Sequence, residues 1–181
     1  MSGLVTFVNL IDRLNERVGR AVAWLTLLMV LITFAVVVLR YVYSIGWVWL
    51  QESYVWLHGI VFMVGAGYTL LHNAHVRVDI FYRPSSVRYK AMVDLFGSLL
   101  LLLPVTLVVT YASYGFVLDS WMRLEQSREA GGLPALFLLK SAILMFCLLI
   151  GLQGLALAGR SFLVLMGHPE FQPEEEETGP I

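Results

Sequence analysis

Long apolar stretches alternate with short polar ones along the chain. Four of them, at about residues 21–43, 48–71, 91–118 and 134–157, consist mainly of apolar residues. Each is longer than the roughly 20 residues that a helix needs to cross the hydrocarbon core of a bilayer. The pattern therefore predicts four transmembrane helices, the last extended along the membrane surface to about residue 166.

The two ends of the chain differ from this core. In residues 1–20, apolar side chains recur on one helical face and charged ones on the other, which predicts an amphipathic helix lying at the membrane interface. An ordinary amphipathic helix packed on protein is the open alternative. Residues 167–181 contain four consecutive glutamates and three prolines, which is typical of a disordered acidic tail.

Composition supports an all-α integral membrane protein, with residues 21–166 as its transmembrane domain. Of the 181 residues, 59% are hydrophobic and 14% are charged, whereas about a quarter are charged in soluble domains. A net charge of -1 gives no basic excess for nucleic acid, so membrane lipids are the expected surroundings. The single cysteine, Cys147, excludes a disulfide within the chain and a cysteine metal site.

The distribution of lysine and arginine predicts the orientation. Positive residues are retained in the cytoplasm. The N-terminal segment, the second loop and the start of the tail carry Arg13, Arg17, Arg20, Arg77, Arg83, Arg88, Lys90 and Arg160. The first and third loops carry only Arg123 and Arg128. Both termini are therefore expected in the cytoplasm.

Two prolines are expected to affect the predicted spans. Pro104 lies inside the third span, where it is expected to kink the helix. Pro134 is expected to start the fourth.

Polar residues inside the first two spans predict an ion pair. Thr26, Thr33 and Arg40 recur every seven residues in the first span, and the second span places Glu52 at a similar depth. A charge within a span costs roughly 2.5 to 3.5 kcal/mol on insertion scales, so Arg40 and Glu52 are predicted to pair, within this chain or through a partner. The alternative is that both extend separately into the headgroup region.

Small residues predict close helix packing. They recur at heptad spacing in the second span and at spacings of three and four in the fourth, as Gly59, Ala66, Cys147, Gly151, Gly154 and Ala158.

The histidines do not favour a cofactor. His75, Arg77 and Asp79 follow the second span and are interpreted as a subunit-interface or orientation cluster, since one histidine makes a weak metal site. His58 is the only histidine within a span, whereas a membrane haem site needs two on facing helices. No metal or other cofactor is predicted, and with no catalytic constellation the chain is not expected to be an enzyme.

Several of these residues carry a family resemblance. Arg40-Tyr41, Trp49 with Glu52, Gly65-Ala-Gly67 and His75-Val-Arg-Val-Asp79 stand in an order and spacing similar to those of the small membrane subunit, DctQ type, of tripartite ATP-independent periplasmic (TRAP) transporters. The likeness covers about residues 10–165. It departs at Gln51, where members often have a second acid.

A further segment resembles one branch of the family. Glu129-Ala-Gly-Gly-Leu-Pro134, Lys140 and Leu152-Gln153-Gly154 look similar to members associated with 2-oxo acids and other carboxylates.

The resemblance implies a non-catalytic scaffold in a bacterial inner membrane. A periplasmic binding protein would deliver an organic acid, and a large multi-span subunit would take it up as a sodium-driven secondary transporter. In the third loop, the candidates for transient docking of the binding protein are Arg123, Glu125, Arg128 and Glu129.

Two alternatives to the scaffold remain open at this stage. One is a haem or redox subunit that uses His58 with His72 or His75, and the other is a small homo-oligomeric channel. The identity of the transported acid, the sodium stoichiometry and the role of the tail are not predicted.

Overall fold

The computed structural model describes residues 2–76, 82, 84–168 and 171, and in these residues all regular structure is helical. The elements are α1 (Ser2–Val42), α2 (Val48–Val64), α3 (Ala66–Leu71), α5 (Val87–Phe96), the π-helical turn η1 (Gly97–Leu102), α6 (Leu103–Met122) and α7 (Leu136–Leu165).

Four helical segments have the length and composition to cross a membrane. They are Gly3–Val42, Val48–Leu71, Val87–Met122 and Leu136–Leu165. The four spans predicted from hydrophobic periodicity are therefore present, although the first and third are longer than expected. Hydropathy marks only the apolar part of a helix, whereas a helix continues into polar sequence until something stops it.

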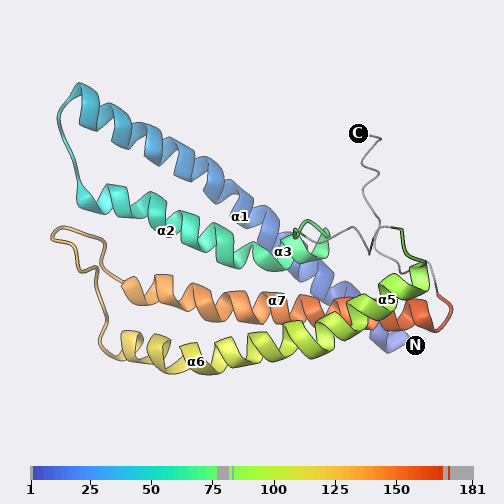
Figure 1. Cartoon of the computed structure of the whole chain (residues 1–181). Coiled ribbons are helices and arrows are strands. Elements are labelled where there is room, and N and C mark those ends of the chain that lie inside the picture. The colour runs from blue at the N-terminus through green and yellow to red at the C-terminus, as the bar shows by residue number, and fades with distance from the viewer. Residues whose placement is uncertain (1, 77–81, 83, 169–170, 172–181) are drawn as a thin grey trace.

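Helix α7 is the centre of the bundle and contacts each of the other helices (Figure 1). Of the small residues predicted to pack closely, Cys147, Gly154 and Ala158 lie on α7 and are buried. A Cβ placed on Gly154 would lie 2.6 Å from Leu102 Cδ2, in the η1 turn. The absence of a side chain there lets the third span approach α7.

Helix α1 is one helix where the sequence predicted a surface helix over 1–20 followed by a span. No proline interrupts residues 2–42, and Gly19 is accommodated inside the helix. The apolar face of the N-terminal half packs on protein, because Val8 and Ile11 form a buried cluster with Ala156 of α7. This packing favours the alternative that the sequence left open, an amphipathic helix docked on protein.

The second half of α1 is much less covered. After Val22 no α1 residue is buried, and large side chains such as Trp24, Phe34 and Tyr41 are exposed. Figure 1 shows this half running beside α2 and away from α6 and α7.

The third span contains a π-helical turn just before Pro104, where the sequence predicted a kink. The π-helical turn η1 ends at Leu102, two residues before the proline. Proline lacks the N–H that would bond four residues back and its ring crowds that carbonyl, so the preceding turn widens. The fourth span starts later than predicted: α7 begins at Leu136, preceded by Ala135 in the left-handed conformation (φ 74°), so Pro134 lies outside its first turn.

The bundle has two distinct ends. The start of α1, α3, the start of α5 and the end of α7 share the first, called here the terminal end (Figure 1). The α1–α2 connection and the α6–α7 loop, residues 123–135, share the second, called here the loop end.

Candidate functional site

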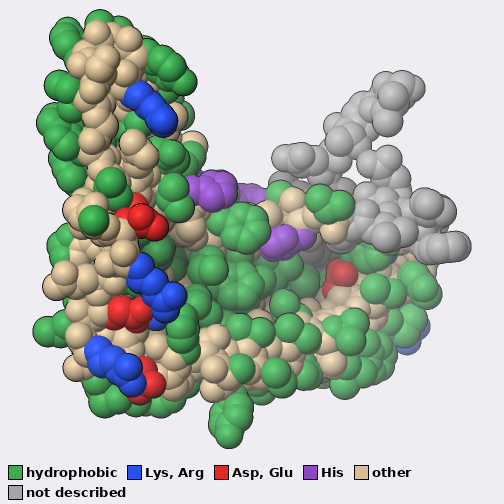
Figure 2. Space-filling model, turned by 60° about the vertical axis from the view of Figure 1, so that its left-hand side comes forward, with side chains coloured by type: hydrophobic (Ala, Val, Ile, Leu, Met, Phe, Trp, Pro, Cys, Tyr) green, Lys and Arg blue, Asp and Glu red, His purple; other side chains and the backbone are tan. Residues whose placement is uncertain are grey.

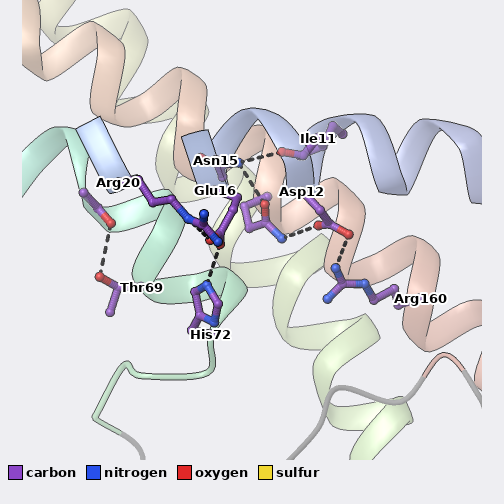
Figure 3. Close-up of polar contacts among 10 residues, drawn as sticks. Ile11, Asp12, Asn15, Glu16, Arg20, Thr69, His72 and Arg160 are labelled. Atoms are coloured by element: carbon purple, nitrogen blue, oxygen red, sulfur yellow. Dashed lines mark hydrogen bonds and ion pairs between the residues drawn. The ribbon is translucent and has the colours of Figure 1, made fainter. Parts of the chain in front are cut away.

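A chain of polar side chains joins α1 to α7 at the terminal end. Asp12 forms an ion pair with Arg160 and accepts a 3.0 Å hydrogen bond from Nε2 of Gln153. Gln153 Oε1 in turn accepts a 2.8 Å bond from Nδ2 of Asn15. Figure 3 shows Asp12, Asn15 and Arg160 where the two helices meet. Both charged side chains are more than four-fifths buried, so each compensates the desolvation of the other.

Asn15 also sets how closely α3 approaches α1. It is 1% exposed, and a Cβ placed on Gly67 would lie 2.2 Å from its Oδ1 and 3.1 Å from the carbonyl oxygen of Leu149. Only glycine leaves room for three helices to meet here. Gly67 therefore has a packing role that accounts for the second glycine of the Gly-Ala-Gly segment.

A second contact ties α1 to the end of α3. Glu16 bonds to Arg20 at 2.6 Å and to Nε2 of His72 at 2.8 Å, and the His72 ring lies 4.4 Å from that of Tyr68. Tyr68 fills the space that a side chain at Gly19 would need. These residues and those around Asn15 and Asp12 are called the terminal cluster.

At the loop end, Glu52 of α2 holds the α6–α7 loop. One carboxylate oxygen accepts a hydrogen bond from the Ser127 hydroxyl, and the other accepts a 2.6 Å bond from the backbone N–H of Leu133. Two loop residues six positions apart are thereby fixed to the start of the second span.

Lys140 anchors the same loop to α7. Its ammonium group pairs with Glu125 and lies 3.8 Å from the centre of the Phe116 ring. The hydrogen bond from Lys140 lowers the pKa of Glu125 below its ordinary value, with the charges of Lys140 and Arg128 acting in the same direction. The charged Glu125 carboxylate is therefore held against Lys140 of α7.

The structure does not pair Arg40 with Glu52 within the chain. Arg40 is exposed, and the hydrogen bonds that Glu52 forms in the described part of the chain go to the α6–α7 loop. Both residues stand at a similar depth by their positions in the spans, but a loop 75 residues later occupies the Glu52 carboxylate. A pair between Arg40 and another protein remains a proposal.

The predicted docking residues are divided by the structure. Arg123, Arg128 and Glu129 are exposed, whereas Glu125 is bound to Lys140. Figure 2 shows acidic and basic side chains close together along the loop end.

Of the predicted cluster after the second span, only His75 lies within the described residues. Its Nε2 is 3.2 Å from the carbonyl oxygen of Ala66. Arg77 and Asp79 lie outside the described residues.

The histidines are poorly placed for a haem. His58 stacks near Phe62. His72, which binds Glu16, follows the last residue of the second span, 14 positions beyond His58, or about 21 Å at 1.5 Å per residue. Within the described residues, no group of three or more metal-ligating side chains gathers.

The terminal cluster was not predicted. Asn15 stood on the apolar face of the first segment and Gln153 inside the fourth span, and a polar residue in an apolar stripe indicates a buried partner. The signal was present, but the 138 positions between them left the pairing undetermined.

Comparison with known proteins gives one family. The family model described as "Tripartite ATP-independent periplasmic transporters, DctQ component" matches residues 29–163. Searches of curated proteins and of solved structures returned no significant match.

Proposed function

The chain belongs to the DctQ family of tripartite ATP-independent periplasmic transporters, and from that premise we propose that it is a non-catalytic scaffold for a larger, multi-span permease subunit. That subunit would carry out sodium-driven uptake of an organic acid delivered by a periplasmic binding protein. The chain would lie in a bacterial inner membrane with both termini in the cytoplasm.

The observation that best supports a scaffold is the division of α1. Its N-terminal half is fixed to α7 through Val8, Ile11 and the Asp12–Arg160 pair. Its second half presents large apolar side chains and Arg40, and in the described part of the chain it runs beside α2 and away from α6 and α7 (Figure 1). A helix held rigidly at one end and uncovered at the other is suited to packing against another membrane subunit.

The groove between α1 and α2 lies on this uncovered face. It has a volume of about 430 Å³ and is lined by Met29, Val30 and Thr33 of α1 and by Tyr54, Val55 and His58 of α2. We place the large subunit against this face, where a carboxylate of that subunit would pair with Arg40.

The decisive experiment is purification of the tagged chain from native membranes in mild detergent, with mass spectrometry of what accompanies it. We expect a large multi-span subunit at about one to one. A homo-oligomer without such a subunit would contradict the scaffold and favour the channel.

Substitutions on the α1–α2 face test whether the large subunit binds there. Phe34→Ala with Arg40→Ala should reduce recovery of the large subunit. Tyr111→Ala, at a side chain that is even more exposed than Phe34 but lies on α6, should leave recovery unchanged. Equal recovery from all variants would place the interface elsewhere.

A further inference from the structure

We infer that Glu52 is a positioning residue that holds the α6–α7 loop in the shape required to dock a soluble protein. The partner surface would carry carboxylates facing Arg123 and Arg128. This inference rests on the proposed function, which supplies a soluble binding protein as the partner.

The carboxylate of Glu52 closes the loop on itself as well as on α2. Its two oxygens accept hydrogen bonds from Ser127 and Leu133, and these two residues are joined directly by a 3.1 Å bond from the Ser127 N–H to the Leu133 carbonyl. The Ser127 hydroxyl oxygen also accepts a 3.1 Å bond from the backbone N–H of Glu129. The segment between Ser127 and Leu133 is therefore a ring built around one carboxylate.

The two glycines of the loop support this arrangement independently. Gly131 has φ +77°, a conformation that side chains rarely adopt. Gly132 has an ordinary φ, yet a Cβ on it would lie 2.7 Å from Glu52 Oε2 and 2.5 Å from Ser127 Oγ. The first glycine permits the turn, and the second permits the carboxylate to approach the backbone.

The α6–α7 loop, of which this ring is a part, presents a defined set of charges to the surroundings. Residues 123–133 contain two arginines and two glutamates, and Lys140 neutralises Glu125. The exposed charges that remain within this segment are Arg123, Arg128 and Glu129, and the two arginines are the groups that carboxylates of a partner would complement. A loop already fixed by Glu52 loses less conformational entropy on docking than a free one.

The test measures docking of the soluble binding protein on the purified membrane complex in nanodiscs. The variants are Glu52→Ala, Glu52→Gln and Glu52→Asp. The matched control is Ser53→Ala, because in the part of the chain that the structure describes the Ser53 hydroxyl donates to the Trp49 carbonyl of its own helix. Hydrogen exchange at the Leu133 amide reports whether the loop is still held.

The three substitutions separate position from charge. Glutamine keeps the reach and one acceptor, whereas aspartate keeps the charge but is one methylene too short. We expect Glu52→Ala and Glu52→Asp to weaken docking about tenfold and to speed exchange at Leu133, with Glu52→Gln intermediate. Ser53→Ala should dock like the unaltered chain.

Three results would overturn the inference. Unchanged docking by Glu52→Ala together with fast exchange at Leu133 would show that docking does not depend on the conformation of the loop. Full docking by Glu52→Asp with loss in Glu52→Gln would assign the effect to charge alone. If the unaltered complex contains the large subunit but does not bind the soluble protein, the loop is not a docking surface for that protein. Purification without a large subunit would instead contradict the proposed function itself.

Discussion

Charged and amide side chains, more than apolar ones, determine where α1 meets α7. Apolar contact between helices is nearly non-directional in a bilayer, because lipid tails are as apolar as leucine. The Asp12–Arg160 pair and the bonds that Gln153 makes to Asp12 and Asn15 fix one register. Any shift along α1 would leave a buried charge without its partner.

Breaking this pair should be costly. Asp12→Ala or Arg160→Ala alone is expected to lower the free energy of unfolding by roughly 3 kcal/mol, because each leaves an uncompensated charge. The double variant should lose less than the sum, which a double-mutant cycle on unfolding in detergent measures.

Arg20→Ala is the control for this cycle. Its side chain is 76% exposed although it pairs with Glu16, so its loss should cost no more than a few tenths of a kcal/mol. Strictly additive losses at Asp12 and Arg160 would contradict the pairing.

A methyl group at Gly67 should separate three helices. Gly67→Ala places a Cβ against Asn15 and the Leu149 carbonyl, so we expect a loss of roughly 1 to 3 kcal/mol, seen as a lower melting temperature in detergent. Gly115→Ala is the matched control, because nothing lies within 4 Å of a Cβ there. It should be neutral or slightly stabilising. Equal melting temperatures would show that Gly67 is not a close contact.

At the scale of the element, α1 acts as a single rod. Its terminal half is held by α7 and α3, and the helix continues without interruption to Val42. The uncovered half that carries Arg40 therefore belongs to the same helix as the half that packs on α7. The π-helical turn before Pro104 shows the opposite case, where a proline changes the helix locally while the span continues.

The continuity of α1 can be measured with spin labels at Leu10 and Leu31. Both are exposed, and in a straight helix they are about 32 Å apart at 1.5 Å per residue. A surface helix meeting the span at a right angle near residue 20 would shorten this to about 22 Å. Electron–electron double resonance in nanodiscs should give the longer distance. The shorter distance would instead support a separate helix at the membrane interface.

At the scale of the whole molecule, the two ends of the bundle differ in their polar contacts. The terminal end holds a buried network that fixes the helices, and the loop end holds an anchored loop with exposed charges. In the proposed orientation, which rests on the asymmetry of lysine and arginine, the terminal end would face the cytoplasm. The loop end would then face the binding protein.

Cysteine labelling tests this orientation without altering the charges. In a Cys147→Ala background, Gln126→Cys should react with a membrane-impermeant maleimide in cells with a permeabilised outer membrane. Asn9→Cys should react only after the inner membrane is opened. The reverse pattern would invert the topology and exclude docking at the loop.

The spans and the family could be predicted from the sequence. The contacts between residues distant in the sequence could not. Glu52 was correctly singled out as an acid that needs a partner, yet its partners come from a loop far along the chain. The terminal half of α1 was correctly described as amphipathic, but periodicity does not distinguish a lipid interface from α7 as the apolar surroundings.

The sequence by itself determined that the chain is an α-helical membrane protein with four spans, since a bilayer requires about 20 apolar residues for each helix that crosses it. Its motifs, in order and spacing, also determined the family. Only the tertiary structure decided that Asp12 meets Arg160, that Gly67 receives Asn15 and that Glu52 holds the loop. Hydropathy depends on each stretch alone, whereas a hydrogen bond depends on two side chains brought together by the packing of helices remote in sequence.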